Sequence, residues 1–125
     1  MFEEKHFTDV GPGWKPILQA LEDSFEALLA RCPNLGAHIK VLQVKEKFGG
    51  LRFYYEANGF SPEERKTLGA IASFAEGLSF RVCEECGKPA TTRTASSNKF
   101  GWVKTFCEEH HAERDAKYPA KDTGL

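Results

Sequence analysis

Apolar residues recur at steps of three and four between Trp14 and Cys32, and acidic residues occupy positions between them. This spacing places the apolar side chains on one face of a helix. Pro16 suits the first helical turn, and Pro33 disfavours helical geometry at Cys32, so the sequence predicts a helix that ends there. Its apolar face consists of Ile17, Leu18, Leu21, Phe25, Leu28 and Leu29.

The pattern changes between Ile39 and Glu56, where β-branched and aromatic residues dominate. Two such runs, interrupted by the pair Gly49-Gly50, predict a β-hairpin. If both strands alternate regularly, neither face is purely polar, and we expect both faces to be at least partly covered. Regular alternation groups Ile39, Val41 and Gln43 on one face and Leu42, Val44 and Phe48 on the other.

A second helix begins after Ser61. This residue can cap the first turn, with Pro62 at the first helical position and Glu64 three residues after the cap. Gly69 and Gly77 each weaken the helix by about 1 kcal/mol relative to alanine, so packing on the hairpin must hold it in place. The predicted apolar stripe consists of Leu68, Ile71, Ala72, Ala75 and Leu78.

Cysteine and histidine spacing is the sharpest chemical signal. A Cys-x-x-Cys pair at Cys83 and Cys86 is followed by Cys107, with His110 three residues further on. Two thiolates of a tight turn can reach one ion, and a cysteine and a histidine at a helix start point to the same side and complete a tetrahedron. We therefore predict a Zn²⁺ site with three cysteine ligands and one histidine. His111 is the alternative fourth ligand.

The segment between the two ligand pairs can form a two-stranded ribbon, with residues 101–106 as its return strand and residues 108–117 as a helix. A knuckle, a ribbon and a helix in this order predict a treble-clef-like lobe. The expected fold class is α+β, with two helices packed on a β-hairpin and followed by that lobe. We expect an α+β core over residues 1–80, a zinc lobe over 81–118 and a flexible tail over 119–125.

A structural role for the zinc is favoured over two alternatives. A redox dithiol at Cys83 and Cys86 is disfavoured because the pair does not join a strand to a helix of a βαβ unit. Catalytic zinc is disfavoured because four protein ligands leave no coordination position for water. Cys32 lies outside this pattern and is expected to be a small core residue.

Composition narrows the class of protein. The 125 residues include 17 basic and 18 acidic side chains, giving a net charge of −1. This excludes the strongly basic profile of an autonomous nucleic-acid binder. The chain has no apolar run near the ~20 residues of a membrane span, and its start does not have the pattern of a signal peptide. We therefore expect a cytoplasmic protein without membrane contact.

Charge is nevertheless uneven along the chain. The hairpin carries Lys40, Lys45, Lys47 and Arg52 against Glu46, and residues 87–106 contain four basic residues and no acidic one. These charges are either a solvated face or one positive surface with aromatic residues for stacking. On the second interpretation the ligand-binding or partner-binding residues are Lys45, Lys47, Arg52, Tyr54, Arg93, Trp102 and Lys104.

No catalytic motif accompanies these features. The chain has no Gly-x-Ser-x-Gly, no Walker loop and no His-Glu-x-x-His, so we predict no catalytic residue and do not expect an enzyme. Gly11-Pro12-Gly13 is expected to be a turn and not a phosphate cradle.

Four segments together resemble small uncharacterised proteins of bacteria, prophages and phages. They are residues 13–18 (GWKPIL), 44–54 (VKEKFGGLRFY), 83–89 (CEECGKP) and 101–110 (GWVKTFCEEH). In such proteins the last motif reads Gly-Trp, two residues, Thr-Leu-Cys, two residues, His, which favours His110 over His111; Phe106 departs from it.

The resemblance implies an accessory or host-takeover role, including interference with a bacterial defence system, and no enzymatic activity comes with it. We therefore expect a non-enzymatic zinc-binding protein that binds a host protein. Binding of a nucleic acid or nucleotide through the positive face is the alternative.

Overall fold

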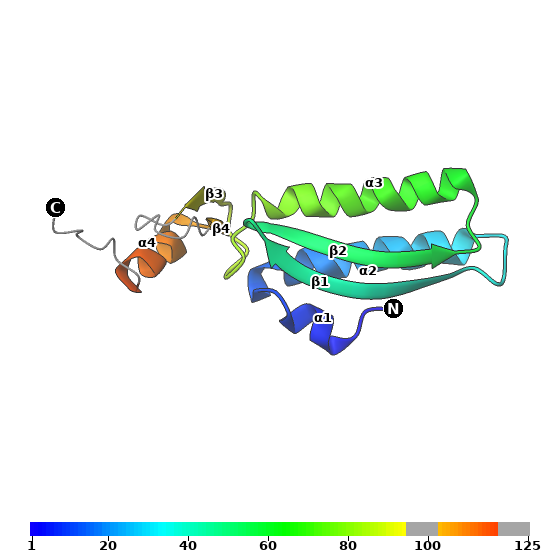
Figure 1. Ribbon diagram of the computed structural model, residues 1–125, viewed down its shortest axis with the longest axis horizontal. Coiled ribbons are helices and arrows are strands. Elements are labelled where there is room, and N and C mark those ends of the chain that lie inside the picture. The colour runs from blue at the N-terminus through cyan, green and yellow to red at the C-terminus, as the bar shows by residue number, and fades with distance from the viewer. Residues whose placement is uncertain (95–102, 118–125) are drawn as a thin grey trace.

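The computed structural model describes residues 1–94 and 103–117. Their fold is α+β, as expected. A long β-hairpin and its helices form the larger part, and a small ribbon with one helix lies beyond one end of the hairpin (Figure 1). The elements in chain order are α1 (Glu4–Thr8), the 3₁₀ turn η1 (Pro12–Trp14), α2 (Lys15–Arg31), β1 (His38–Lys47), β2 (Gly50–Asn58), α3 (Pro62–Ser79), β3 (Thr91–Thr94), β4 (Val103–Phe106) and α4 (Glu108–Lys117).

Helix α2 confirms the first prediction. Cys32, the residue before Pro33, has an extended backbone with ψ 125° and ends the helix. Ile17, Leu18, Leu21 and Phe25 are buried in the main core. The buried face is slightly narrower than predicted, because Leu28 and Leu29 near the end of the helix are only partly buried.

Strands β1 and β2 pair antiparallel from His38 opposite Asn58 to Lys47 opposite Gly50. The turn residues are Phe48 and Gly49, with φ of 54° and 85°, and Gly50 already belongs to β2. Two consecutive positive φ angles give a two-residue turn whose twist matches that of the strands. Gly49-Gly50 therefore marked the hairpin correctly, but the turn lies one residue earlier.

A β-bulge between Val41 and Gln43 overturns the expected alternation of β1. The extra residue moves Val44 to the same buried face as Val41, while Leu42 stays 46% exposed. The outward face is covered only in part, where Lys5, His6 and Asp9 lie beside Leu42, Gln43 and Tyr54. Lys40, Arg52, Tyr54 and Glu56 are exposed on the outward face.

Helix α3 starts with the predicted capping box. Ser61 Oγ accepts from the backbone N–H of Glu64, and the Glu64 carboxylate accepts from the N–H of Ser61. Its buried stripe is narrower than expected. Leu68, Ala72, Ala75 and Ser79 are buried, whereas Ile71 is half-buried and Leu78 is 38% exposed.

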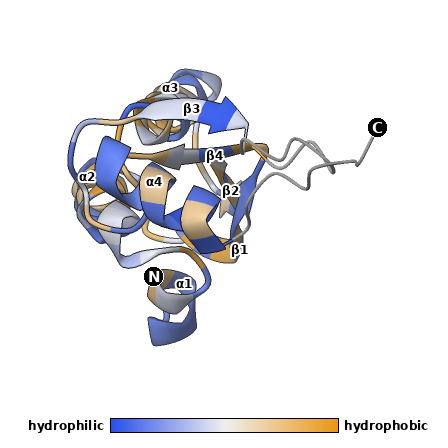
Figure 2. Cartoon of the chain, turned by 90° about the vertical axis from the view of Figure 1, so that its left-hand side faces the viewer, coloured by the Kyte–Doolittle hydropathy of each residue, from blue (hydrophilic) through white to orange (hydrophobic). Residues whose placement is uncertain are grey.

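Two hydrophobic clusters organise the described residues. The larger joins α2, α3 and the inward face of the hairpin, and the fully buried Trp14 belongs to it. The smaller consists of Cys83, Phe106 and Cys107, with Ala90 packed against it. Figure 2 views the molecule from the end that carries α4 and the β3–β4 ribbon.

The chain between α3 and β3, the ribbon and α4 follow the expected order of knuckle, ribbon and helix. We refer to residues 81–94 and 103–117 as the C-terminal lobe. Its membership of the treble-clef class stays a prediction, and the expected tail lies outside the described residues. Within the ranges that the structure describes, no helix is long and apolar enough to cross a membrane.

Candidate metal centre

The first two predicted ligands lie in the turn that follows α3. The N–H of Cys83 donates to the carbonyl of Lys88 (2.8 Å), and the N–H of Gly87 donates to the carbonyl of Cys83 (2.9 Å). Gly87 has φ 82°, a left-handed backbone that glycine adopts at little cost. These bonds close a tight knuckle that carries Cys83 and Cys86.

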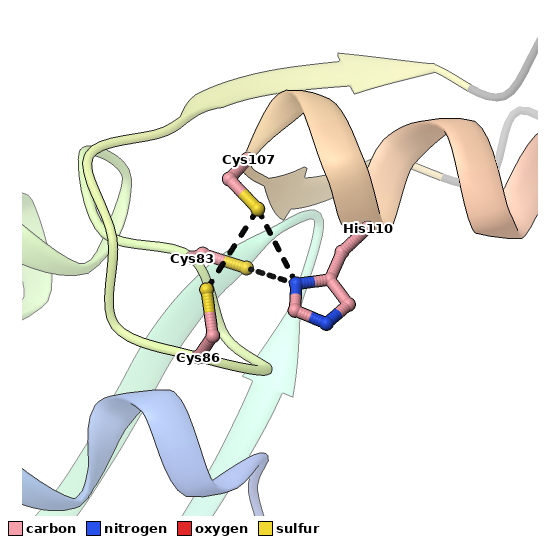
Figure 3. Close-up of side chains that lie close together, drawn as sticks. All are labelled: Cys83, Cys86, Cys107 and His110. Atoms are coloured by element: carbon pink, nitrogen blue, oxygen red, sulfur yellow. Dashed lines mark hydrogen bonds between the residues drawn. The ribbon is translucent and has the colours of Figure 1, made fainter.

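The other two ligands flank the start of α4. Cys107 directly follows β4, and His110 lies in the first turn of the helix. The four side chains converge on one point, with all ligand atoms within 4.8 Å of one another (Figure 3). Nδ1 of His110 lies 3.3 Å from Sγ of Cys107 and 3.5 Å from Sγ of Cys83, and the Sγ atoms of Cys86 and Cys107 are 3.7 Å apart. The cluster can therefore hold a metal ion.

The structure selects between the two histidines. His110 turns Nδ1 toward the thiols, and its Nε2 lies 3.9 Å from a carboxylate oxygen of Glu113. His111 points elsewhere, with Nδ1 3.3 Å from Arg114 and Nε2 3.2 Å from Asp115. The predicted ligand His110 thus belongs to the cluster, and His111 does not.

The thiols differ in acidity. The pKa of Cys107 is lowered to about 7, first by the backbone N–H of His110 and then by the His110 ring and the other thiols. The backbone N–H of Lys88 lowers the pKa of Cys86, but desolvation and the neighbouring thiols of Cys83 and Cys107 together outweigh it, so the pKa is raised. Cys107 therefore supplies a thiolate, the form that binds metals, most readily at neutral pH.

A glycine-rich loop outside the predicted site supports the knuckle. The N–H of Gly13 donates to the carbonyl of Glu84 (2.7 Å), and the N–H of Gly11 donates to its carboxylate (3.0 Å). The indole N–H of Trp14 donates to the carbonyl of Val82 (2.9 Å). The expectation of a turn at residues 11–13 is correct, but its role in docking the knuckle was missed. The sequence signal that could have indicated this docking role is the pair of glycines, Gly11 and Gly13, followed by Trp14 directly before helix α2.

The hairpin turn provides a second attachment. The buried hydroxyl of Thr105 donates to the carbonyl of Gly49 (2.6 Å). Lys104 Nζ lies 2.7 Å from Glu46 and 3.6 Å from Glu84. Burial alone lowers the pKa of Lys104, but these carboxylates outweigh it and the pKa is raised. The pKa of Glu84 is raised, chiefly by burial, although Gly11 and Lys104 lower it.

These contacts divide the predicted positive surface. Lys104 is neutralised within the chain, and Arg93 lies 3.0 Å from Glu108. Lys45, Lys47, Arg52 and Tyr54 lie on β1 and β2, and Trp102 lies outside the described residues. A single face built from Lys45, Lys47, Arg52, Arg93 and Lys104 stays a prediction.

Cys32 is a separate, buried residue of the main core, as expected, with its Sγ 3.9 Å from the carbonyl of Gly59.

Comparison of the chain with protein-family models, with curated proteins and with solved structures gave no match.

Proposed function

We propose that this protein is a small, non-enzymatic zinc-binding protein in which Cys83, Cys86, Cys107 and His110 hold a structural Zn²⁺. A tetrahedral zinc ion, with Zn–S bonds of about 2.3 Å and Zn–N bonds of about 2.0 Å, sets its ligands about 3.8 Å (S to S) and about 3.5 Å (S to N) apart. Here Sγ of Cys86 and Sγ of Cys107 are 3.7 Å apart, Nδ1 of His110 lies 3.3 to 3.5 Å from Sγ of Cys107 and Cys83, and all ligand atoms lie within 4.8 Å of one another. This agreement carries the proposal.

A structural role follows from the ligand count. Four protein ligands complete the tetrahedron and leave no position for a water or a substrate. The lobe also has little core of its own, because its buried apolar cluster consists of Cys83, Phe106 and Cys107. The metal takes the place of a hydrophobic centre that so few residues cannot form.

Elemental analysis of protein purified without chelators tests the metal. We expect one zinc per chain, and loss of the lobe's amide protection in a strong chelator while the main core keeps its own. Absence of zinc, together with unchanged exchange in the chelator, would contradict the proposal. If elemental analysis finds one equivalent of another metal instead of zinc, the metal site is confirmed and only the identity of the ion in the proposal is wrong.

We further propose that the protein acts by binding another protein, and the exposed side of α3 supports this. Phe74 is 73% exposed and Leu78 is 38% exposed. Glu76 turns away from this side, because its carboxylate accepts from the backbone N–H of Phe53 (2.9 Å). The exposed side of the helix around Phe74 and Leu78 thus carries no charged residue at positions 70, 71, 73, 74, 77 and 78, all of which are exposed or half-exposed. We call Ala70, Ile71, Ser73, Phe74, Gly77 and Leu78 the α3 face.

Gly77 adds an independent argument. A Cβ built at Gly77 meets no described atom within 4 Å, so the chain's own packing does not require glycine there. Glycine in a helix interior costs about 1 kcal/mol relative to alanine. A partner that approaches the helix backbone closely would explain why a small residue stands beside Phe74 and Leu78. An apolar centre of this kind is typical of protein interfaces.

The resemblance to proteins of phages and mobile elements suggests what the partner is. We propose an accessory protein whose partner is a host protein, with components of bacterial defence systems as the first candidates.

A second candidate function is binding of a nucleic acid or nucleotide at the hairpin. Lys45 Nζ lies 5.6 Å from the ring centre of Tyr54, which is 43% exposed. A cation beside an exposed aromatic plane can hold a phosphate while a base stacks. This candidate is the weaker one, because Lys104, which lies beside the basic end of the hairpin, is paired with carboxylates within the chain.

Affinity purification from a bacterial host separates the two candidates. We expect wild type and the control Lys5→Asp, an exposed change on α1, to recover the same stoichiometric protein, and Phe74→Asp to lose it. Recovery of a nuclease-sensitive ligand that Phe74→Asp retains, and that Lys45→Glu with Lys47→Glu loses, would favour the second candidate. Nucleic-acid binding would also weaken steeply with salt.

A further inference from the structure

Two arginines meet in the C-terminal lobe on the side of the ribbon that faces α4. Arg93 lies within β3, and Arg114 lies on α4 with only 9% of its surface exposed. Arg114 Nη2 donates to the backbone carbonyl of Arg93 (3.3 Å), and the Arg114 guanidinium lies 5.3 Å from the ring centre of Phe106. The buried Arg114 guanidinium is therefore held against the backbone of Arg93, close enough for the charge of the Arg93 side chain to lower the pKa of Arg114.

Four of their guanidinium nitrogens are buried and have no acceptor within residues 1–94 and 103–117. They are Nε and Nη2 of Arg93 and Nε and Nη1 of Arg114. Buried polar groups are normally hydrogen-bonded, and a buried charged donor without an acceptor is more costly than a neutral one. The arrangement is incomplete without a further acceptor.

The unpartnered atoms of Arg93 have a specific geometry. Nε and Nη2 form one edge of the guanidinium plane, the fork that binds two oxygens of one anion side by side. The opposite nitrogen, Nη1, is already used by Glu108 (3.0 Å), whose side chain is 87% exposed. The ion pair with Glu108 therefore leaves the fork free.

We propose that Arg93 and Arg114 form a binding site for a tetrahedral oxyanion of the phosphate type. Two adjacent cations favour a doubly charged anion, since a dianion offsets both charges at once. Arg93 can hold two oxygens of the anion through its fork, and a tetrahedral anion keeps a further oxygen for an unpartnered nitrogen of Arg114, which a carboxylate with two oxygens does not.

The surrounding charges agree with this assignment. Burial lowers the pKa of Arg114, Asp115 raises it and Arg93 lowers it further. Asp115 also lies 3.2 Å from His111, and Glu108 is on the solvent side of Arg93. These carboxylates offset part of the positive charge but do not supply acceptors to the four unpartnered nitrogens. The site is separate from the α3 face and from the four metal ligands, and goes beyond the proposed function.

The test uses the zinc-loaded, full-length protein and titrates inorganic phosphate, with sodium acetate at matched ionic strength as the comparison. We expect one saturable site per chain, with chemical-shift changes at the Nε–H signals of Arg93 and Arg114 in ¹⁵N NMR spectra. Arg93→Lys keeps the charge and removes the fork, and we expect it to weaken phosphate binding at least tenfold. The matched control Arg52→Lys, on the exposed hairpin face, should bind as wild type does.

Several outcomes would overturn the proposal. They are no saturable response to phosphate, equal binding of acetate, equal weakening by Arg52→Lys, or shifts elsewhere without change at the two arginine signals. If Arg93→Lys loses its zinc, the phosphate titration of the wild-type protein still shows whether the Nε–H signals of Arg93 and Arg114 respond to the anion. A nucleoside monophosphate that binds more tightly than phosphate assigns the oxyanion to a larger molecule, whereas equal or weaker binding assigns it to the free ion.

Discussion

Gly13 lies so close to Cys83 that a Cβ atom at position 13 would collide with the Cys83 carbonyl oxygen. The same Cβ would lie 2.5 Å from the backbone nitrogen of Gly87 and 2.7 Å from that of Cys86. A residue before the first long helix thus packs on the backbone of the metal knuckle, 70 positions later in the chain. This contact couples the main core to the candidate zinc site.

Gly13→Ala should therefore destabilise the lobe. The atoms in the way belong to the backbone and cannot move aside, so we expect a loss of about 1–3 kcal/mol, typical of overpacking. Chemical denaturation and zinc content of the purified variant measure the effect. Gly69→Ala is the control, because a Cβ at Gly69 meets no described atom within 4 Å. It should stabilise the protein by up to about 1 kcal/mol. Equal stabilities of the two variants would contradict the contact.

The two adjacent histidines should behave differently. His110→Asn removes the nitrogen that faces the thiols, and we expect zinc affinity to fall by at least tenfold. His111→Asn changes a residue that contacts Arg114 and Asp115 and should leave the zinc stoichiometry at one. Competition with a chromogenic chelator measures both affinities. A greater loss for His111→Asn would mean that the fourth ligand is misassigned.

Thr105→Val should loosen the lobe from the hairpin turn. The change keeps the shape of the buried side chain but leaves the carbonyl of Gly49 without its donor, which costs about 1–3 kcal/mol. Thr105→Ser keeps the hydroxyl and should lose less. Hydrogen exchange at Gly49, Gly50 and the lobe amides locates the effect. Unchanged exchange in Thr105→Val would show that the hydroxyl does not fasten the two parts.

Gly77→Ala should have opposite effects on stability and on partner binding. Open space at this position allows the methyl group, and the free protein should gain up to about 1 kcal/mol. The same methyl group would hinder a partner that approaches the helix closely. Thermal unfolding and the yield of captured partner measure the two effects. A variant that is more stable and binds fully would remove Gly77 from the proposed interface.

Local patterns in the sequence were sufficient for the elements that depend on nearby residues. Pro16 and Pro33 bounded α2, and Ser61 with Glu64 marked the start of α3, because capping acts within one helical turn. Spacing also identified Cys83, Cys86, Cys107 and His110, since a zinc site requires ligands at short intervals.

The bulge in β1 could not be predicted in this way. Strict alternation puts Val41 and Val44 on opposite faces, and only the burial of both against the helices shows that one extra residue is inserted. The pairing of Lys104 could not be predicted for a similar reason. Lys104 and Glu46 are 58 residues apart in sequence, so their pairing becomes visible only when the lobe docks on the hairpin.

By itself, the sequence determined the α+β class, the two main helices, the hairpin and the convergence of four metal ligands, because propensity, capping and ligand spacing act over a few residues. Tertiary structure decided which side of each element is buried, which charges remain free and how the lobe is attached. Gly13 against Cys83 and Thr105 against Gly49 depend on how separate segments pack, and packing is set by the whole chain.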